Sequence, residues 1–196
     1  MRLVLASTSP RRKELLGQLG LRFDIIPSEF DEGTITTADP AQLVRELAIG
    51  KARAVLSGLI GETIVIGADT IVLLDGEILG KPCDEAAARA MLASLAGRTH
   101  RVLTGVALIH LPDGREVVDH TETAVTMRPL TPGQIDAYVA SGEPMDKAGA
   151  YAVQGLGSVL VERLEGDYFT VVGLPLPRLA RLLEDFGLNV LANAAR

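Results

Sequence analysis

The chain has 196 residues, enough for one full hydrophobic core, so we expect a single domain over residues 1–196. Its hydrophobic content of 47% and charged content of 22% are ordinary for a globular enzyme. No apolar stretch approaches the ~18 residues of a membrane span, and the net charge of -6 argues against a nucleic-acid partner. The single cysteine, Cys83, excludes an internal disulfide and a cysteine-built metal cluster, which suits a cytoplasmic location.

The order of predicted elements is that of a mixed α/β protein. After a buried strand at 3–6, Ser9 and Pro10 predict a helix start, with serine as the N-cap and proline as the first helical residue. Further helices are expected to begin at Asp39-Pro40, at Asp84 and at Thr131-Pro132, and a last one covers 176–186. Strands are predicted at 22–26, 63–67, 71–74, 102–110, 116–127, 159–164 and 169–172, with a short one leading to Gln154.

Turn signals decide the type of sheet. Asp75-Gly76 predicts a two-residue hairpin, and Pro112-Asp113-Gly114 predicts another turn. Because the order also requires crossovers, we expect a mixed sheet rather than a purely parallel one.

The segment Ser7-Thr8-Ser9-Pro10-Arg11-Arg12-Lys13 has the character of an anion site. Cations in the first turn of a helix oppose its dipole, so stability alone would favour acidic residues there. A bound anion resolves this conflict, whereas the alternative is a capped surface helix with solvated basic residues. The glycine spacings of phosphate-binding and dinucleotide-binding loops are absent.

Asp69 stands in the middle of an apolar run, Val65–Val72. A carboxylate there is costly unless it binds a metal, a cation or a proton relay, although an aspartate capping a bulge is the alternative. An aspartyl nucleophile of the DxD type is disfavoured because residue 71 is isoleucine.

Other chemical groups are ordinary when taken singly. Gly80-Lys81-Pro82 places a lysine after a hairpin strand, and 143–155 packs charges into a stiff loop that leads to Gln154. Lys51 follows Gly50 within a helix, where glycine costs up to ~1 kcal/mol and suggests close packing against a ligand or loop. Asp31-Glu32 is either a turn or a metal-binding pair. The histidines, at 100, 110 and 120, show no ligand spacing.

Together these segments resemble the Maf proteins, a family of septum-formation inhibitors and nucleoside triphosphate pyrophosphatases. The resemblance covers nearly the whole chain, through ASTSPRRKELL, SEFDE, IGKARA, IGADTIV, GKP, GRTHRVLTG, EPMDKAGAYAVQG and YFTVVGLPL. It implies a Maf/inosine-triphosphatase-like α/β fold, an elongated mixed sheet flanked by helices with a cleft between two lobes. It also implies a homodimer and a divalent cation, Mg²⁺ or Mn²⁺.

The resemblance also assigns roles to residues. Catalytic roles fall on Asp69 as proton acceptor and on Lys81, Lys51 and Arg11, and metal binding falls on Asp69 and Glu32, with Asp31 as the alternative. Substrate binding falls on Ser7, Ser9, Arg12, Thr70, Asp146, Lys147 and Gln154. The implied reaction is attack of water on the α-phosphorus of a nucleoside triphosphate, with pyrophosphate leaving in line.

Within the family, Arg12, Thr70 and Gln154 match the branch that hydrolyses dTTP and UTP. A glutamine amide offers a donor to O4 and an acceptor to N3–H of uracil or thymine. The 7-methyl-GTP branch has a tryptophan for stacking on a cationic base, and this chain contains no Trp. Two alternatives stay open, a nucleotide-sensing regulator of septum formation without catalysis and a purine (inosine or xanthosine) triphosphatase.

Overall fold

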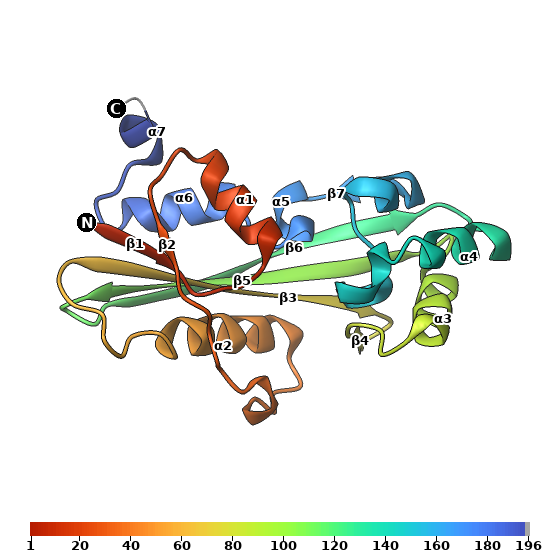
Figure 1. Cartoon of the computed structure of the whole chain (residues 1–196), viewed down its shortest axis with the longest axis horizontal. Coiled ribbons are helices and arrows are strands. Elements are labelled where there is room, and N and C mark those ends of the chain that lie inside the picture. Colours follow the sequence, from red (N-terminus) through yellow and green to blue (C-terminus); the bar gives the residue numbers. More distant parts are fainter. Residues whose placement is uncertain (195–196) are drawn as a thin grey trace. The chain divides into compact units, whose positions relative to one another are not determined.

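A computed structural model describes residues 1–194, with side chains described up to Ala192 (Figure 1). The strands are β1 (Arg2–Leu5), β2 (Asp24–Ile25), β3 (Thr63–Leu74), β4 (Glu77–Leu79), β5 (Thr99–Leu111), β6 (Glu116–Met127) and β7 (Val161–Glu165). The α-helices are α1 (Pro10–Gln18), α2 (Pro40–Arg53), α3 (Glu85–Leu95), α4 (Pro132–Ala140), α5 (Tyr168–Val172), α6 (Leu176–Glu184) and α7 (Val190–Ala194). The 3₁₀ turns are η1 (Glu32–Thr34), η2 (Glu143–Asp146), η3 (Ala148–Ala150) and η4 (Gly155–Leu160).

The strands form a mixed sheet, as predicted. Its order is β2-β1-β3-β5-β6-β7, with β4 paired to β3. Strand β1 pairs in parallel with both β2 and β3, whereas the pairs β3–β4 and β6–β7 are antiparallel. Within residues 1–194, no helix is both long enough and apolar enough to cross a membrane.

The chain divides into two compact units. Unit 1 comprises 1–69, 104–121 and 173–196, and unit 2 comprises 70–103 and 122–172. Strands β3, β5 and β6 therefore contribute residues to each of them.

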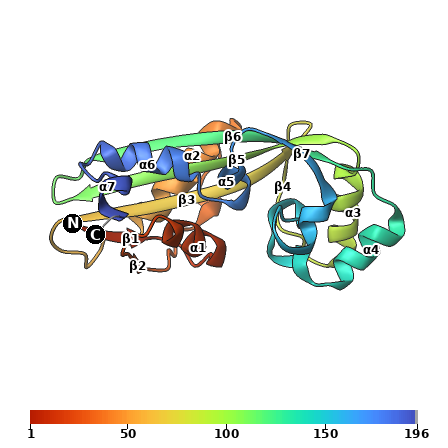
Figure 2. The same cartoon turned by 90° about the horizontal axis from the view of Figure 1, so that it is seen from above.

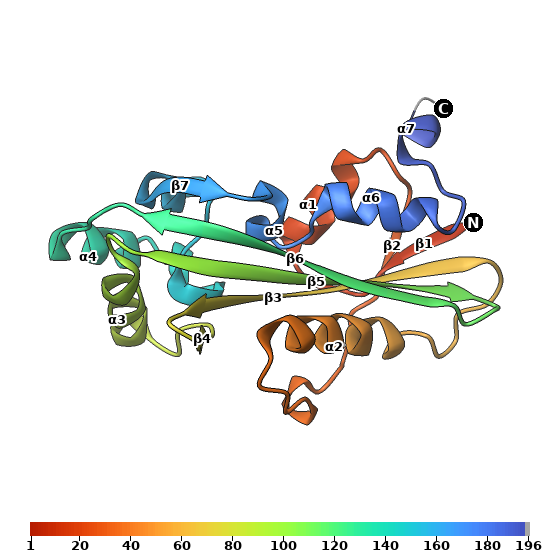
Figure 3. The same cartoon turned by 180° about the vertical axis from the view of Figure 1, so that it is seen from behind.

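In unit 1, helix α2 lies along one face of the sheet, and α1 and α6 lie on the other (Figures 1 and 3). Two glycines allow the close approach of α2. A Cβ at Gly67 would lie 2.1 Å from the Ala48 carbonyl oxygen, and one at Gly105 would lie 2.0 Å from that of Val44. Because real Cβ contacts are never this short, α2 rests directly on the backbone of β3 and β5.

Unit 2 has its own core under helices α3 and α4, which lie beside each other (Figure 2). Leu92 and Leu95 of α3 and Val139 of α4 are buried in it. His100 is also buried here, and its Nε2 forms a 2.6 Å hydrogen bond with the hydroxyl of Tyr151, a residue of this core.

Predicted helix starts are confirmed by their caps. The side chains of Ser9, Asp39, Asp84 and Thr131 each accept a backbone N–H of the helix that follows. The Asp75-Gly76 turn also joins β3 to β4 as predicted, with positive φ values of 52° and 89°.

Five predicted strands differ from the structure. The break expected between 63–67 and 71–74 is absent, since β3 is continuous, and the 22–26 strand shrinks to Asp24–Ile25. The strand leading to Gln154 is also absent, and η4 begins at Gly155, whose φ is 62°. Residues 169–172 form part of α5, since the Asp167 carboxylate accepts the N–H groups of Phe169 and Thr170.

Candidate active site

The start of helix α1 is built as the sequence predicts. The Ser9 hydroxyl accepts the Arg12 N–H at 3.5 Å, and the buried Ser7 hydroxyl accepts the Ser9 N–H at 3.2 Å. No acidic residue lies in the first turn of this helix. The two hydroxyls therefore fix the backbone of a basic helix start, a geometry suited to an anion.

Arg12 is held in place by a residue far along the chain. Its Nε donates to the Gly173 carbonyl oxygen at 2.9 Å. Burial lowers the pKa of Arg12, while Asp69 opposes this shift, Arg11 adds to it and Glu32 also opposes it. Arg12 is therefore close enough to Arg11, Asp69 and Glu32 to interact with the charge of each.

Asp69 lies buried in β3, with 8% of its surface exposed. Its Oδ1 accepts a hydrogen bond from the Lys51 ammonium, and the same Nζ lies 2.7 Å from Glu32 Oε1. Lys51 reaches Asp69 because Gly67 lets α2 lie against β3. The compensating charge explains why the aspartate does not interrupt the strand.

The geometry separates the roles of Asp31 and Glu32. Asp31 caps η1, since its Oδ1 accepts the Gly33 N–H at 3.0 Å. Glu32 instead turns to Lys51. The structure thus favours Glu32 as the second carboxylate beside Asp69.

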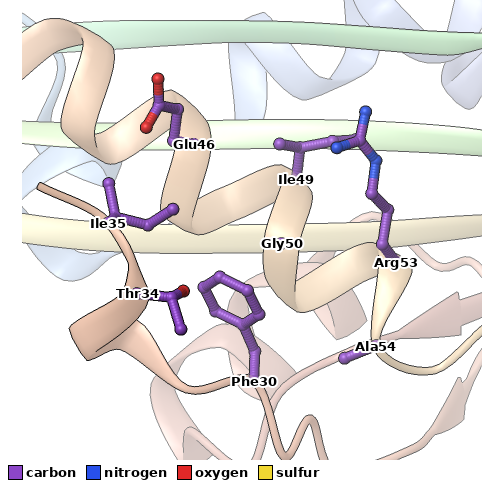
Figure 4. A pocket seen from close by; sticks show the side chains of 8 residues that line it. All are labelled: Phe30, Thr34, Ile35, Glu46, Ile49, Gly50, Arg53 and Ala54. Carbon is purple, nitrogen blue, oxygen red and sulfur yellow. The ribbon is translucent and has the colours of Figure 1, made fainter. Parts of the chain in front are cut away.

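Phe30 holds the loop that carries Glu32. Its ring lies against Gly50 of α2, where an added Cβ would come within 2.4 Å of Phe30 Cζ. Figure 4 shows this ring facing the helix, in a cavity of about 610 Å³ lined by the loop residues Thr34 and Ile35 and by α2. The expectation that Gly50 permits close packing is confirmed, and its partner is the loop.

In unit 2, the lysine loop is tied to a second segment. Lys147 Nζ donates to Asp146 Oδ1 and to the Glu143 carbonyl oxygen, both at 2.6 Å. The Gly149 N–H donates to the Gly80 carbonyl oxygen at 3.0 Å, which brings the backbone next to the exposed Lys81 alongside η3.

Of the three residues predicted for the base, Arg12 belongs to unit 1, and Thr70 and Gln154 occupy different elements of unit 2. Gln154 is half-buried directly before η4, and Thr70 is half-buried in β3 directly after Asp69. The structure thus distributes the predicted residues over both units. Unit 1 holds Ser7, Ser9, Arg11, Arg12, Glu32, Lys51 and Asp69, and unit 2 holds Thr70, Lys81, Asp146, Lys147 and Gln154.

Two residues with clear structural roles were missed from the sequence. Gly173 accepts from Arg12, and Glu143 binds the backbone after Gln154. Glu143 carried a signal, a carboxylate among the glycines and proline of a stiff loop. Gly173 carried none, because its contribution is a carbonyl group that every residue has.

The carboxylates of Asp69 and Glu32 are suited to a divalent cation. Both converge on one positive group, the Lys51 ammonium, and both offer hard oxygen donors. Among the described residues, no group of three or more His, Cys, Asp or Glu side chains could hold a metal ion. Mg²⁺ commonly needs only one or two carboxylates together with substrate phosphates, so this donor set fits it.

A mixed sheet flanked by helices, with the buried Asp69 paired to Lys51 in the same unit as a basic capped helix start, defines a class of α/β protein equipped for anions. A family model described as "Maf-like protein" matches residues 2–186, and the chain belongs to this family.

Relatives resemble the chain over nearly its whole length. A protein of Moorella thermoacetica named dTTP/UTP pyrophosphatase is 58% identical over 96% of this chain and 97% of its own. Proteins with the same name from Symbiobacterium thermophilum and Clostridioides difficile are 51% and 48% identical, over 98% and 95% of each chain.

Solved structures align over a smaller part. A dITP/XTP pyrophosphatase from Mycobacterium abscessus has a TM-score of 0.40 at 19% identity, over 65% of this chain and 73% of that one. The Ham1 protein of Staphylococcus aureus has a TM-score of 0.45 at 18% identity, over 65% and 72%.

Proposed function

We propose that the chain is a nucleoside triphosphate pyrophosphatase that hydrolyses dTTP and UTP to the monophosphate and pyrophosphate. The observation that carries the proposal is the buried Asp69 carboxylate, paired with Lys51 and within the electrostatic reach of Arg12. The names of the relatives support the same activity and substrates.

Asp69 favours catalysis over binding alone. A carboxylate placed near a triphosphate repels it, and a protein that only senses nucleotides gains nothing from that repulsion. A hydrolase does gain, because a positioned carboxylate can orient water and accept its proton.

The proposed reaction starts with water, which Asp69 orients toward the α-phosphorus. The water oxygen forms a bond to phosphorus, the bond to the bridging oxygen breaks, and its electron pair leaves with pyrophosphate. Asp69 accepts the proton and releases it to solvent. Lys51, Arg11, Lys81 and Lys147 stabilise the charge on the phosphates, with Asp146 orienting Lys147 through their hydrogen bond.

We assign a divalent cation, Mg²⁺ or Mn²⁺, to Asp69 and Glu32. When bound, such an ion supplies neutralising charge and Lewis acidity toward the phosphates. The Ser9-capped helix start, with Ser7 behind it, provides backbone N–H groups for a phosphate in the same unit.

We assign recognition of the base to Gln154, Thr70 and Arg12. The Gln154 amide can donate to O4 and accept from N3–H of uracil or thymine. A freely rotating amide would present the same groups to cytosine in reverse order, so its neighbours must fix its orientation.

The proposal also includes a cytoplasmic location and a homodimer. A mass measurement in solution tests the dimer.

Hydrolysis in ¹⁸O-water tests the reaction. The label should appear in the nucleoside monophosphate, because the attacked phosphorus is α. Label in inorganic phosphate or only in pyrophosphate would refute the mechanism.

A panel of triphosphates with pyrophosphate detection tests the substrate. UTP and dTTP should exceed ATP and GTP by orders of magnitude. Preference for ITP or XTP would identify a purine triphosphatase, and binding without turnover would identify a sensor of nucleotides.

A further inference from the structure

Glu143 is a hub that joins several parts of unit 2. Its Oε1 accepts the Tyr138 hydroxyl at 2.9 Å and the Gly157 N–H at 2.9 Å. Its Oε2 accepts the Leu156 N–H at 3.0 Å. One carboxylate thus receives three donors, two of which belong to the turn that follows Gln154.

The glycines of that turn are shaped around the hub. A Cβ at Gly155 would lie 2.6 Å from Glu143 Oε2, and the φ of Gly155 is +62°. A Cβ at Gly157 would lie 2.7 Å from the Tyr138 hydroxyl and 2.3 Å from the Ala152 carbonyl oxygen. The turn at 155–157 therefore packs closely against Glu143 and Tyr138, with no room for a side chain at either glycine. This packing fixes the backbone on the C-terminal side of Gln154.

The charge of Glu143 is stabilised where it lies. Burial opposes its ionisation, but the Gly157 and Leu156 N–H groups, the Tyr138 hydroxyl and the Lys147 charge outweigh it, and the pKa of Glu143 is lowered. Burial, followed by the hydrogen bond to Glu143 and its charge, raises the pKa of Tyr138 far above its ordinary value. Tyr138 thus stays a neutral donor and Glu143 stays a charged acceptor at neutral pH.

The backbone of Glu143 holds a second loop. Its carbonyl oxygen accepts from Lys147 Nζ at 2.6 Å. Glu143 therefore contacts Lys147, which is assigned to the phosphates, and also the turn beside Gln154, which is assigned to the base.

We propose that Glu143 is a positioning residue for base selectivity, which fixes the backbone that carries Gln154 through its hydrogen bonds to the Leu156 and Gly157 N–H groups and to the Tyr138 hydroxyl. This inference rests on the proposed function, in which Gln154 recognises the base. Glu143 supplies a fixed backbone beside Gln154, from which the amide reaches the base in one position.

Glu143→Gln is the sharpest variant because it keeps the size of the side chain. An amide has one acceptor oxygen, so in either orientation its NH₂ must face the N–H of Gly157 or of Leu156 and repel it. Tyr138→Phe removes one of the three donors without changing the ring. Glu122→Gln is the matched control, since Glu122 lies in the same unit and pairs with Arg101 at an exposed position.

The experiment measures kcat/KM for UTP and CTP in the full chain, with thermal melting of each variant. Gln154→Ala gives the reference for lost recognition, and we expect it to remove most of the preference for UTP. Glu143→Gln should lower the UTP-to-CTP ratio by roughly 10-fold, a fraction of the discrimination that a polar site can reach. Tyr138→Phe should lower it less, and Glu122→Gln should leave it unchanged.

Several outcomes would overturn the inference. One is equal loss of both substrates in Glu143→Gln, which would give the residue a role in folding alone. Another is an unchanged ratio in Tyr138→Phe and Glu143→Gln, or in Gln154→Ala. If the unaltered protein does not hydrolyse UTP, the proposed function fails instead, and the two failures are distinct.

Discussion

At the residue scale, the main feature is the Lys51 ammonium, which has two carboxylate partners. Asp69 and Glu32 both contact the Lys51 ammonium, so the lysine keeps a partner if either carboxylate is changed. Removing one member of a buried ion pair commonly costs ~3–5 kcal/mol because it leaves a charge unpaired. Here the second carboxylate limits that cost, and variants at Asp69 remain testable.

We expect Asp69→Asn to keep the fold and to bind UTP, yet to lose at least ~100-fold in turnover, the scale of a positioned acid or base. Turnover and nucleotide binding are measured separately. Asp31→Asn is the matched control, since an asparagine can also cap η1, and it should stay active. Near-normal turnover of Asp69→Asn would make Asp69 structural.

At the element scale, glycines decide where helix α2 lies and what lies on it. Gly67 and Gly105 bring the helix against the sheet, and Gly50 admits the Phe30 ring on its other side. The helix therefore places Lys51 between Asp69 and the Glu32 loop.

We expect Gly50→Ala to impair activity although alanine favours a helix by up to ~1 kcal/mol. The added Cβ would lie 2.4 Å from the Phe30 ring, so the ring must move and the Glu32 loop with it. Turnover should fall several-fold, with no rise in melting temperature. Gly133→Ala in α4, where nothing lies within 4 Å, is the control and should be stabilising. A more stable and fully active Gly50→Ala would contradict this role of Phe30.

At the scale of the whole molecule, the assigned residues belong to two compact units, each with its own core. The chemistry proposed for the unit 1 residues includes a divalent ion, and unit 2 contains a buried histidine whose pKa is lowered. Each of these features leads to a prediction that can be tested on the full chain.

We expect EDTA to abolish turnover and Mg²⁺ or Mn²⁺ to restore it, because only carboxylate oxygens are assigned to the ion. Glu32→Gln should raise the Mg²⁺ concentration needed for half-maximal turnover, and Asp31→Asn should not. Full turnover in EDTA-treated protein would refute the assignment of the cation.

Burial lowers the pKa of His100 from 6.5 to about 4. The unfolded chain thus binds a proton near pH 6.5 that the folded chain resists. The stabilisation is complete above pH 6.5 and is lost as the pH falls toward 4, by up to ~1.4 kcal/mol per pH unit. Denaturant unfolding at several pH values measures this slope. His100→Gln should reduce the slope over this range, and an unchanged slope would assign it to other groups.

The sequence alone determined the features that depend on neighbouring residues. Caps and tight turns form within a few residues, so Ser9, Asp84 and Asp75-Gly76 predict element boundaries directly. The strand predicted at 169–172 was wrong because Asp167 caps a helical turn that outweighs β-branched propensity.

The tertiary structure alone decided which distant groups meet. Arg12 donates to the carbonyl oxygen of Gly173, which is 161 positions away, and Lys51 pairs with Glu32 and not with Asp31. A single sequence does not encode these pairs in any local pattern. The Lys51–Glu32 pair, for example, follows from how closely α2 packs on the sheet and where the Phe30 loop rests on the helix. The motifs therefore identified the chemical groups, and the packing of backbone on backbone at Gly67 and Gly105 arranged them.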